Sequence, residues 1–417
     1  MVSKSNYIFI IILCISHILS EIDYGSESLK INEKYKGKLS IKSRVSIQDQ
    51  EDLSIVYTPG VAEPCKKIYE NKALTYKYTI KGRTLAVISD GSSVLDLGDI
   101  GPEAALPLIE GKALLFKEFG EIDAFPICLG TKDPKEIIKT VKYISPTFGG
   151  INLEDISAPK CLEIEETLKE ELNIPVFNDN IDGISIAVLA GIINSLKIVK
   201  KRWKDLKIVI SGTGVVGLSI FKLLMHFNPE DIILANSNGT VYEGKPGLSP
   251  ILQKYAKITN KYKQTGTVFH GLAKADIFIV TSGPKVISKL DVRTMKKDSI
   301  IFALSDQIPE NMPEEAFAGG ARIVATGRGD FPNQISNILV FPGLFKGALM
   351  VRSTKIVEDM KIAAANALAS LVHERELNEK YIIPDIFDKR CAKVVAEEVA
   401  TVAEYLGLAQ APGNREW

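Results

Sequence analysis

The sequence has few of the residues on which zinc, disulfide and nucleic-acid-binding proteins depend. Five of its 417 residues are cysteine, four are histidine, and no two cysteines have the spacing Cys-x-x-Cys. We therefore expect neither a zinc site nor a disulfide framework, and interpret the cysteines as free, buried thiols. Lys and Arg together number 51, as do Asp and Glu, so the net charge is zero. The charge gives no reason to expect a nucleic acid or an anionic membrane surface as partner, and an anionic substrate must be held by local charge.

One apolar run stands at the N-terminus, and it is short. Lys4 precedes thirteen mostly apolar residues, 7–19, which end at Ser20 and Glu21. A helix needs about 20 residues to span a bilayer, so we expect no stable membrane span. The layout predicts a signal-peptide-like segment, residues 1–24, that directs the chain to the secretory pathway or an organelle. The alternatives are a mistaken start codon and a cytoplasmic protein, and a glycosylation sequon at Asn238 argues against a lumenal location.

The rest of the chain is typical of a soluble α/β protein of two domains, with 46% apolar and 24% charged residues. Short apolar runs predict strands, and longer amphipathic or apolar segments between them predict helices, which is the pattern of parallel sheets in both halves. The predicted strands are 85–89, 124–129, 150–153, 175–177, 206–210, 231–235, 276–280, 299–303 and 322–325. The predicted helices are 102–119, 132–143, 158–172, 184–196, 215–226, 360–374 and 392–406. We place the domains at residues 25–182 and 183–417, the second including the C-terminal helices.

A glycine-rich turn between a predicted strand and a predicted helix indicates a dinucleotide site. Residues 211–217 read SGTGVVG, which places Gly212, Gly214 and Gly217 in the spacing G-x-G-x-x-G. Glycine lets the backbone approach a pyrophosphate at the helix N-terminus, where Val215 and Val216 begin the helix. The acidic residue expected about twenty positions later, where it would bind the ribose, is replaced by Asn236.

Acidic side chains follow two of the predicted strands in the N-terminal half. Glu154 and Asp155 follow one strand, and Asp179 follows another. Parallel strands present their carboxyl ends at one edge of a sheet, where ligands bind. Carboxylates there suit Mg²⁺ or Mn²⁺, although a solvated acidic rim is an equal alternative from these residues alone.

Five segments resemble the motifs of the malic enzymes, and in particular of the compact bacterial type. They are SIVYTPGVAEPC (54–65), SDGSSVLDLGDIGP (89–102), EGKALLFKEF (110–119), PTFGGINLEDISAP (146–159) and GRGDFPNQ (327–334). The resemblance extends from about residue 28 to 410. It implies an N-terminal malic domain with a parallel-type α/β sheet, a C-terminal Rossmann-type NAD(P)-binding domain, and a homodimer.

The resemblance also implies a reaction and roles for single residues. The reaction is the oxidative decarboxylation of (S)-malate to pyruvate and CO₂, with NAD or NADP as oxidant and Mg²⁺ or Mn²⁺ as metal. Lys112 would take the proton of the C2 hydroxyl, for which we expect burial to depress its pKa. Tyr57 would protonate the enolate and Asp179 would tune Lys112. The metal ligands would be Glu154, Asp155 and the residue at position 180, and the substrate amide would be Asn337.

The chain departs from the family pattern at and near this site. The departures are Asp96, Asn180, Asp182, Ile184, Asn236, Asp306 and Ser336. Asn180 replaces a carboxylate, which predicts weak metal binding. Asp182 offers a carboxylate two residues later, and the alternative is that it faces elsewhere. Asp306, counted with the cofactor-binding residues, replaces an amide and would repel a dianionic substrate. Asn236 predicts weak dinucleotide binding with little discrimination between NAD and NADP.

The departures leave three interpretations open. The first is an active malic enzyme with altered metal, cofactor or acid preference. The second is a degenerate relative that acts as a binding or assembly protein. The third, a weaker one, is a dehydrogenase of another 2-hydroxy acid. The retained Tyr57, Lys112, Glu154, Asp155 and Asp179 favour an enzyme.

Overall fold

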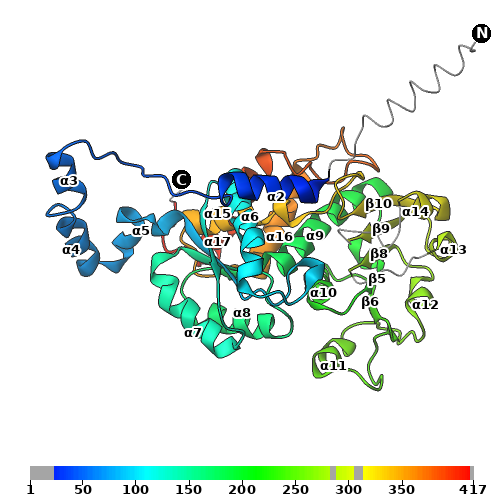
Figure 1. Cartoon of the computed structure of the whole chain (residues 1–417). Helices are drawn as coiled ribbons and strands as arrows, with labels where there is room; N and C mark the ends of the chain where they lie inside the picture. The colour runs from blue at the N-terminus through cyan, green and yellow to red at the C-terminus, as the bar shows by residue number, and fades with distance from the viewer. Residues whose placement is uncertain (1–22, 282–287, 305–312, 414–417) are drawn as a thin grey trace, which may run out of the picture. The chain divides into compact units, whose positions relative to one another are not determined.

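The computed structural model describes residues 23–281, 288–304 and 313–413. The chain divides into two compact units, residues 1–44 and 45–417. The first unit contains α2 (Tyr24–Tyr35), which begins after the N-cap Asp23 and buries none of its residues. The second unit contains both sheets and the helices from α3 onward (Figure 1). The predicted signal segment, residues 1–24, lies almost wholly outside the described residues.

A four-stranded parallel sheet forms the core of the N-terminal half. Its strands are β1 (Thr84–Ser89), β2 (Asp123–Cys128), β3 (Gly150–Leu153) and β4 (Val176–Phe177), in the order β2-β1-β3-β4. Leu85 in β1 stands opposite Ala124 in β2 and Gly150 in β3, and both pairs of strands are parallel, as predicted. Every residue of β1 is buried, as expected of a central strand covered on both faces.

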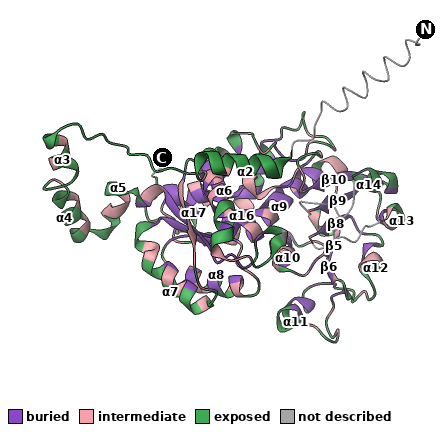
Figure 2. Ribbon diagram, viewed as in Figure 1, coloured by how far each residue is buried: buried purple, intermediate pink, exposed green. Residues whose placement is uncertain are grey.

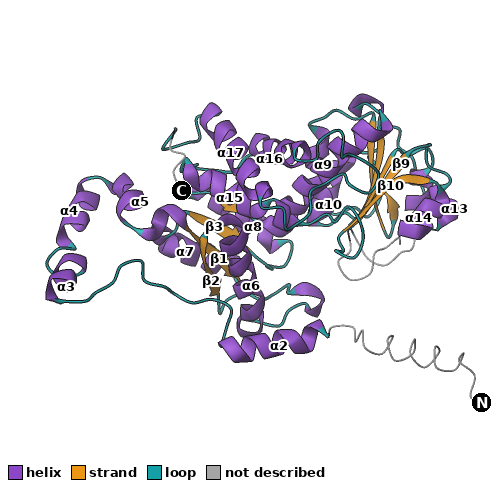
Figure 3. Cartoon of the chain, turned by 90° about the horizontal axis from the view of Figure 1, so that it is seen from above, coloured by secondary structure: helices purple, strands orange, loops and turns teal. Residues whose placement is uncertain are grey.

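The second sheet has six strands in the order β10-β9-β8-β5-β6-β7 and is parallel except for β7. Its strands are β5 (Lys207–Ser211), β6 (Asp231–Asn236), β7 (Gly239–Thr240), β8 (Ile277–Val280), β9 (Ser299–Ala303) and β10 (Ala321–Thr326). Figure 3 shows this sheet, in orange, apart from the four-stranded one. The predicted α/β fold with a Rossmann-type second half is confirmed.

Helices connect the strands, and the predicted ones are present with shifted ends. The larger ones are α6 (Pro102–Gly120), α7 (Pro134–Ile144), α8 (Lys160–Glu171), α9 (Asp179–Val199), α10 (Val215–Met225), α15 (Phe341–Met350), α16 (Glu358–Ser370) and α17 (Arg390–Tyr405). The shorter ones are α3 (Gln50–Val56), α4 (Ala62–Glu70), α5 (Thr75–Tyr78), α11 (Pro250–Ala256), α12 (Val268–Leu272), α13 (Lys289–Val292) and α14 (Pro313–Gly319).

Helix α9 is long and apolar enough to cross a membrane, but 78% of its most apolar window is buried inside the protein. It contacts α10, α16 and the short turn η6 (Asn337–Leu339), so its apolar surface is part of the core. The predicted domain boundary at 182–183 falls within this helix. Figure 2 shows the burial of the sheets and of the helices around α9, in contrast to the exposed α3 and α4.

Aromatic side chains fix the helices that surround the candidate site. The ring of Phe116 in α6 lies 4.7 Å from that of Phe341 and 5.5 Å from that of Phe345, both in α15. Phe345 also meets Phe177 of β4 at 5.9 Å. These edge-to-face contacts are fully buried and hold α6 and α15 in a fixed position beside β4.

The four described cysteines are all unpaired. Cys161 and Cys391 are buried, as predicted, but Cys65 is exposed. The prediction of uniformly buried thiols was wrong for Cys65, because α4, which carries it, buries no residue, and for Cys128, which is only partly buried.

Candidate active site at the end of the four-stranded sheet

Two consecutive carboxylates, Glu154 and Asp155, follow β3 at the edge of the sheet. The N–H of Glu154 donates to the carbonyl of Ile88 at 2.8 Å, which extends the ladder by one residue, and Glu154 is 2% exposed. Asp155 then adopts a φ of 50°, in the left-handed region that Asp tolerates better than most residues. Both carboxylates accept a hydrogen bond from the same side chain, that of Asn180.

The first turn of α9 supplies the opposite side of the site. We predicted a helix from residue 184, but it begins at Asp179, after the extended N-cap Asn178. Asp179 and Asn180 therefore lie in the first helical turn. A carboxylate is favourable there because the N-terminal end of a helix carries partial positive charge.

Lys112 of α6 lies among these carboxylates. Its Nζ is 2.5 Å from Asp179 Oδ2 and 3.1 Å from Glu154 Oε1, and its side chain is 9% exposed. The ammonium also lies 4.6 Å from the ring centre of Phe341. Burial acts to lower the pKa of Lys112, but the charges of Asp179 and Glu154 outweigh it and raise this pKa. The expected depression of the pKa was wrong, because two carboxylates surround the lysine.

Asn337 closes the site from η6. Its Nδ2 donates to Asp179 Oδ2 at 3.0 Å and to Asn180 Oδ1 at 3.2 Å. Ser336, the departure before it, caps η6 by accepting the N–H of Ile338. The approach of η6 depends on Gly183, since a Cβ at that position would lie 2.9 Å from the Cβ of Asn337.

The oxygens of this cluster fit a hard divalent cation. Asp155 Oδ2 and Asp179 Oδ1 are buried and have no hydrogen-bond partner in the described part of the chain. Unpartnered carboxylate oxygens at such a point are the ligands that Mg²⁺ and Mn²⁺ prefer. Asn180, however, turns its Nδ2 toward Glu154 Oε1 at 3.0 Å and Asp155 Oδ1 at 2.9 Å, so its amide must turn over to offer Oδ1 to a cation. Among residues 23–281, 288–304 and 313–413, no three His, Cys, Asp or Glu side chains form a ligand set.

Asp182 does not replace the missing carboxylate. Its Oδ2 lies 2.6 Å from Lys361 Nζ in α16, and its Oδ1 accepts the hydroxyl of Ser219 in α10 at 2.6 Å. Of the two alternatives for this carboxylate, the structure agrees with the one in which it faces elsewhere. Along the helix it lies about 200° around from Asn180, so it faces the neighbouring helices instead of β3.

Tyr57 lies apart from the cluster in the described structure. It ends α3, and its side chain is 67% exposed. All described residues of α3, α4 and α5 are at least partly exposed. Figures 1 and 3 show α3 and α4 away from the helices that carry Lys112 and Asp179. The structure thus brings together the other predicted catalytic and metal residues, but not Tyr57.

The glycine turn has the geometry of a pyrophosphate seat. Gly212 has a φ of 127°, and a Cβ on Gly217 would lie 2.1 Å from the carbonyl oxygen of Gly212. Only glycine fits both positions. Gly214 is the N-cap of α10, and Val215 and Val216 form its first turn. Asn236 ends β6 beside this turn, whereas Asp306 lies outside the described residues.

Sequence reasoning missed two residues that contact the cluster. Asn152 Nδ2 donates to Glu154 Oε2 at 2.9 Å, and Phe341 packs under the ammonium of Lys112. Asn152 could have been found, since it is an amide in an apolar strand, two residues before Glu154 and on the same face. Phe341 gives no such signal, because only the packing of α15 against α6 brings it there.

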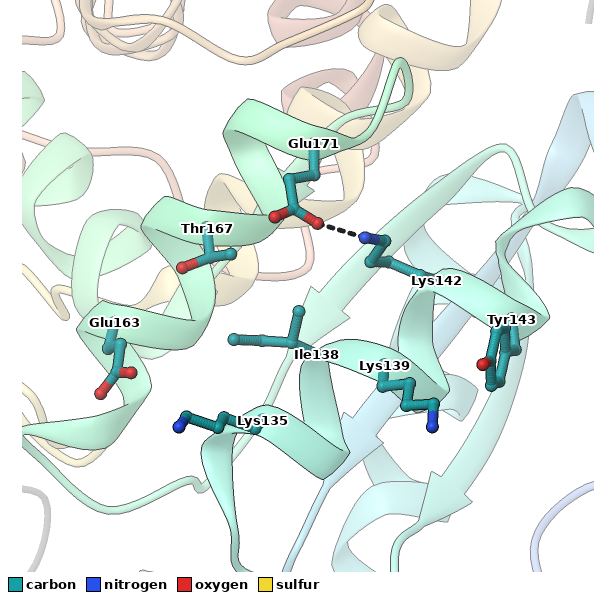
Figure 4. Close-up of a pocket in the computed structure, with 8 residues that line it drawn as sticks. All are labelled: Lys135, Ile138, Lys139, Lys142, Tyr143, Glu163, Thr167 and Glu171. Carbon is teal, nitrogen blue, oxygen red and sulfur yellow. Dashed lines mark hydrogen bonds and ion pairs between the residues drawn. The ribbon is translucent and has the colours of Figure 1, made fainter.

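A separate hollow of about 450 Å³ lies on the surface between α7 and α8 (Figure 4). An ion pair of 2.5 Å between Lys142 and Glu171 crosses it, and both side chains are more than two-fifths exposed. It contains none of the residues predicted for the active site. Its lining residues are Lys135, Ile138, Lys139, Lys142, Tyr143, Glu163, Thr167 and Glu171.

Comparison with known proteins agrees with this geometry. The family models described as "Malic enzyme, N-terminal domain" and "Malic enzyme, NAD binding domain" match residues 36–169 and 181–404. The chain is 50% identical to a bifunctional malic/malolactic enzyme of Bacillus subtilis, over 92% of this chain and 94% of that one. It is 49% identical to an NAD-dependent malic enzyme of Geobacillus stearothermophilus, over 90% of this chain and 78% of the other.

Solved structures give the same result. A malic enzyme from Pyrococcus horikoshii superimposes with a TM-score of 0.87 and 42% identity, covering 91% of this chain and 92% of that one. A malic enzyme from Entamoeba histolytica superimposes with a TM-score of 0.87 and 36% identity, covering 94% and 83% of the two chains. The two domain matches, the relatives and the shared fold lead to one conclusion: the chain belongs to the malic enzyme family.

Proposed function

We propose that this protein catalyses the NAD(P)-dependent oxidative decarboxylation of (S)-malate to pyruvate and CO₂. The observation that carries the proposal is the buried contact between Lys112 and Asp179, inside a group of oxygens at the carboxyl end of a parallel sheet. A binding or assembly protein has no need for a buried lysine among three carboxylates, since burying charge is costly. In this reaction malate loses a hydride to NAD(P)⁺ and a carboxyl group as CO₂, and the proton removed from the C2 hydroxyl is balanced by the proton that the enolate gains at C3.

Each residue of the site has a separate role in this reaction. Mg²⁺ or Mn²⁺ at Glu154, Asp155 and Asn180 would polarise the C2 oxygen of malate, while the nicotinamide accepts the hydride. Lys112 takes the C2 hydroxyl proton. It becomes a better base once a cation offsets the negative charge of Glu154, because this charge is one of the two that raise its pKa against the effect of burial. Asn337 holds the substrate through its amide.

The remaining proton donor, Tyr57, comes from a second copy of the chain. The segment that carries it exposes several large apolar side chains, which suits an interface between subunits. They include Val45, Ile47, Leu53, Ile55, Val56, Val61 and Tyr69. In a homodimer built through this segment, each site combines the lysine of one chain with the tyrosine of the other.

A complementation experiment tests this arrangement. Tyr57→Phe and Lys112→Ala subunits are each expected to be nearly inactive in forming pyruvate. If the subunits are mixed and allowed to exchange, about a quarter of the sites receive both intact residues. Recovery of about a quarter of the parent's pyruvate formation supports the shared site. No recovery, despite proven subunit exchange, contradicts it.

The function itself is tested by measuring NADH or NADPH formation from malate by the purified protein with Mn²⁺. We expect activity in the parent and none in Lys112→Ala. Lys117→Ala is a matched control, since Lys117 lies five residues further along α6 and pairs with Asp123 on the surface. An inactive parent that binds malate or a dinucleotide would instead favour the binding-protein interpretation.

The N-terminal segment, residues 1–24, directs the chain into the secretory pathway or an organelle. Support comes from Lys4 before a thirteen-residue apolar run that ends at Ser20. The test is to determine the N-terminal residue of the native protein together with its cell fraction. An uncleaved chain in the cytoplasm would overturn this proposal.

A further inference from the structure

We propose that the turn after β6 and the ammonium of Lys245 bind the 2′-phosphate of NADP⁺, so that this chain prefers NADP⁺ to NAD⁺. The inference rests on the proposed function for the use of a dinucleotide. The juxtaposition that carries it is a turn of neutral, hydrogen-bond-donating residues, 236–240, with a lysine attached to its backbone.

The ribose position has lost the acceptor that selects NAD⁺. A carboxylate at the end of the second Rossmann strand binds the 2′-hydroxyl and repels a 2′-phosphate. Here the residue is Asn236, and its Oδ1 already accepts the N–H of Asn238 at 2.9 Å. Its Nδ2 lies 3.4 Å from the hydroxyl of Thr213 in the glycine turn. The Nδ2 of Asn236 therefore faces the glycine turn, where this N–H group can donate a hydrogen bond to a phosphate oxygen.

Lys245 adds a positive charge to this turn. Its Nζ donates to the carbonyl oxygens of Asn238 and Thr240, both at 2.8 Å. An ammonium has three donors, so one is left after these two bonds. Its position is fixed by the backbone of the turn that ends the ribose-binding strand, and it remains partly exposed.

No acidic side chain neutralises this lysine within the described residues. Lys245 forms no ion pair there, whereas Lys263 pairs with Glu243 and Lys207 donates to Gln264 Oε1. The acidic residue on the same loop, Glu243, lies 3.1 Å from Lys263 and is engaged by it. The charge of Lys245 is thus available to an anion, and a charge-assisted contact to phosphate is stronger than a neutral one.

The alternative is that Lys245 serves only to hold the turn together. The two roles differ in a measurable way, because loss of the turn would weaken both dinucleotides equally. Loss of a phosphate contact would weaken NADP⁺ alone. Sequence reasoning predicted little discrimination from Asn236, and the position of Lys245 shifts that expectation toward NADP⁺.

The experiment is calorimetric titration of the full-length protein with NADP⁺, NAD⁺, 2′,5′-ADP and 5′-ADP. The last two probes compare a 2′-phosphate with its absence without the nicotinamide. We expect the parent to bind NADP⁺ and 2′,5′-ADP more tightly than NAD⁺ and 5′-ADP. Lys245→Met should weaken the two 2′-phosphorylated ligands by about tenfold or more and leave the other two unchanged.

Two further variants make the result specific. Lys245→Arg keeps the charge and should retain the preference for NADP⁺. Lys257→Met removes an exposed lysine elsewhere in the same domain and should change nothing. Equal weakening of all four ligands in Lys245→Met, or a parent that prefers NAD⁺, overturns the inference. A parent that binds no dinucleotide contradicts the proposed function instead.

Discussion

Replacing Asn180 with aspartate is expected to destabilise the metal-free protein and to strengthen its binding of Mn²⁺. In the structure, the Nδ2 of Asn180 bridges Glu154 Oε1 at 3.0 Å and Asp155 Oδ1 at 2.9 Å. In the metal-free site, the amide of Asn180 therefore replaces a cation in part, because it holds the two carboxylates together. Asn180→Asp removes both donors and adds a further negative charge.

The size of the effect follows from these contacts. Each hydrogen bond to a carboxylate is worth about 1.5–3 kcal/mol, so the two lost bonds cost about 3–6 kcal/mol. Like charges about 4 Å apart repel by on the order of 4 kcal/mol at an effective dielectric constant of about 20. Uptake of a proton by one carboxylate limits the total. We expect a loss of at least about 3 kcal/mol, which lowers the melting temperature by roughly 3 °C or more for a protein of this size.

Thermal unfolding in chelator and in saturating Mn²⁺, with calorimetric titration of the metal, measures both effects. The variant should melt below the parent in chelator and bind Mn²⁺ at least about tenfold more tightly, because a third anionic ligand faces the dication. Asn173→Asp is the control, since Asn173 is exposed and the same charge change there should alter neither property. If Asn180→Asp matched the parent both in chelator and in its affinity for Mn²⁺, the amide would not lie between the two carboxylates and the reasoning would be refuted.

Four further outcomes are expected. Lys112→Ala should lower malate oxidation by about 10²–10⁴-fold while dinucleotide binding persists, and an unimpaired rate would remove Lys112 from the mechanism. Gly183→Ala places a Cβ 2.9 Å from that of Asn337, so the KM for malate should rise, whereas Gly130→Ala, where nothing lies within 4 Å, should have no effect in the same kinetic assay. Burial raises the pKa of Asp155 to about 6, so calorimetry should show Mn²⁺ affinity falling as the pH drops through that value, because the ligand must be ionised. In the metal-free protein, the same raised pKa of Asp155 makes the free energy of unfolding fall as the pH rises from the ordinary value of 3.8 toward about 6. A melting temperature that rose over this range would contradict the burial of Asp155.

The sequence alone was sufficient for the strands, the glycine seat and the membership of the cluster. The strands were predictable because apolar runs in a buried parallel sheet are continuous, as in β1, where all six residues are buried. Gly212 and Gly217 were predictable because no side chain fits the turn that they form. Glu154, Asp155 and Asp179 could be expected together, since parallel strands bring their carboxyl ends to one edge.

The tertiary structure alone decided the direction and environment of each side chain. Asp182 is two residues from Asn180 in the chain, yet it pairs with Lys361, which is 179 positions further along. The pKa of Lys112 rises instead of falling because Asp179 and Glu154, from two other elements, lie within 3.1 Å of its ammonium. Hydrogen bonds to two backbone carbonyls hold Lys245 beside the turn after β6, and such bonds cannot be predicted from the sequence. Local sequence patterns determine secondary structure, because they act through the backbone of a few neighbouring residues. Charge, orientation and partners depend on atoms that only folding brings together.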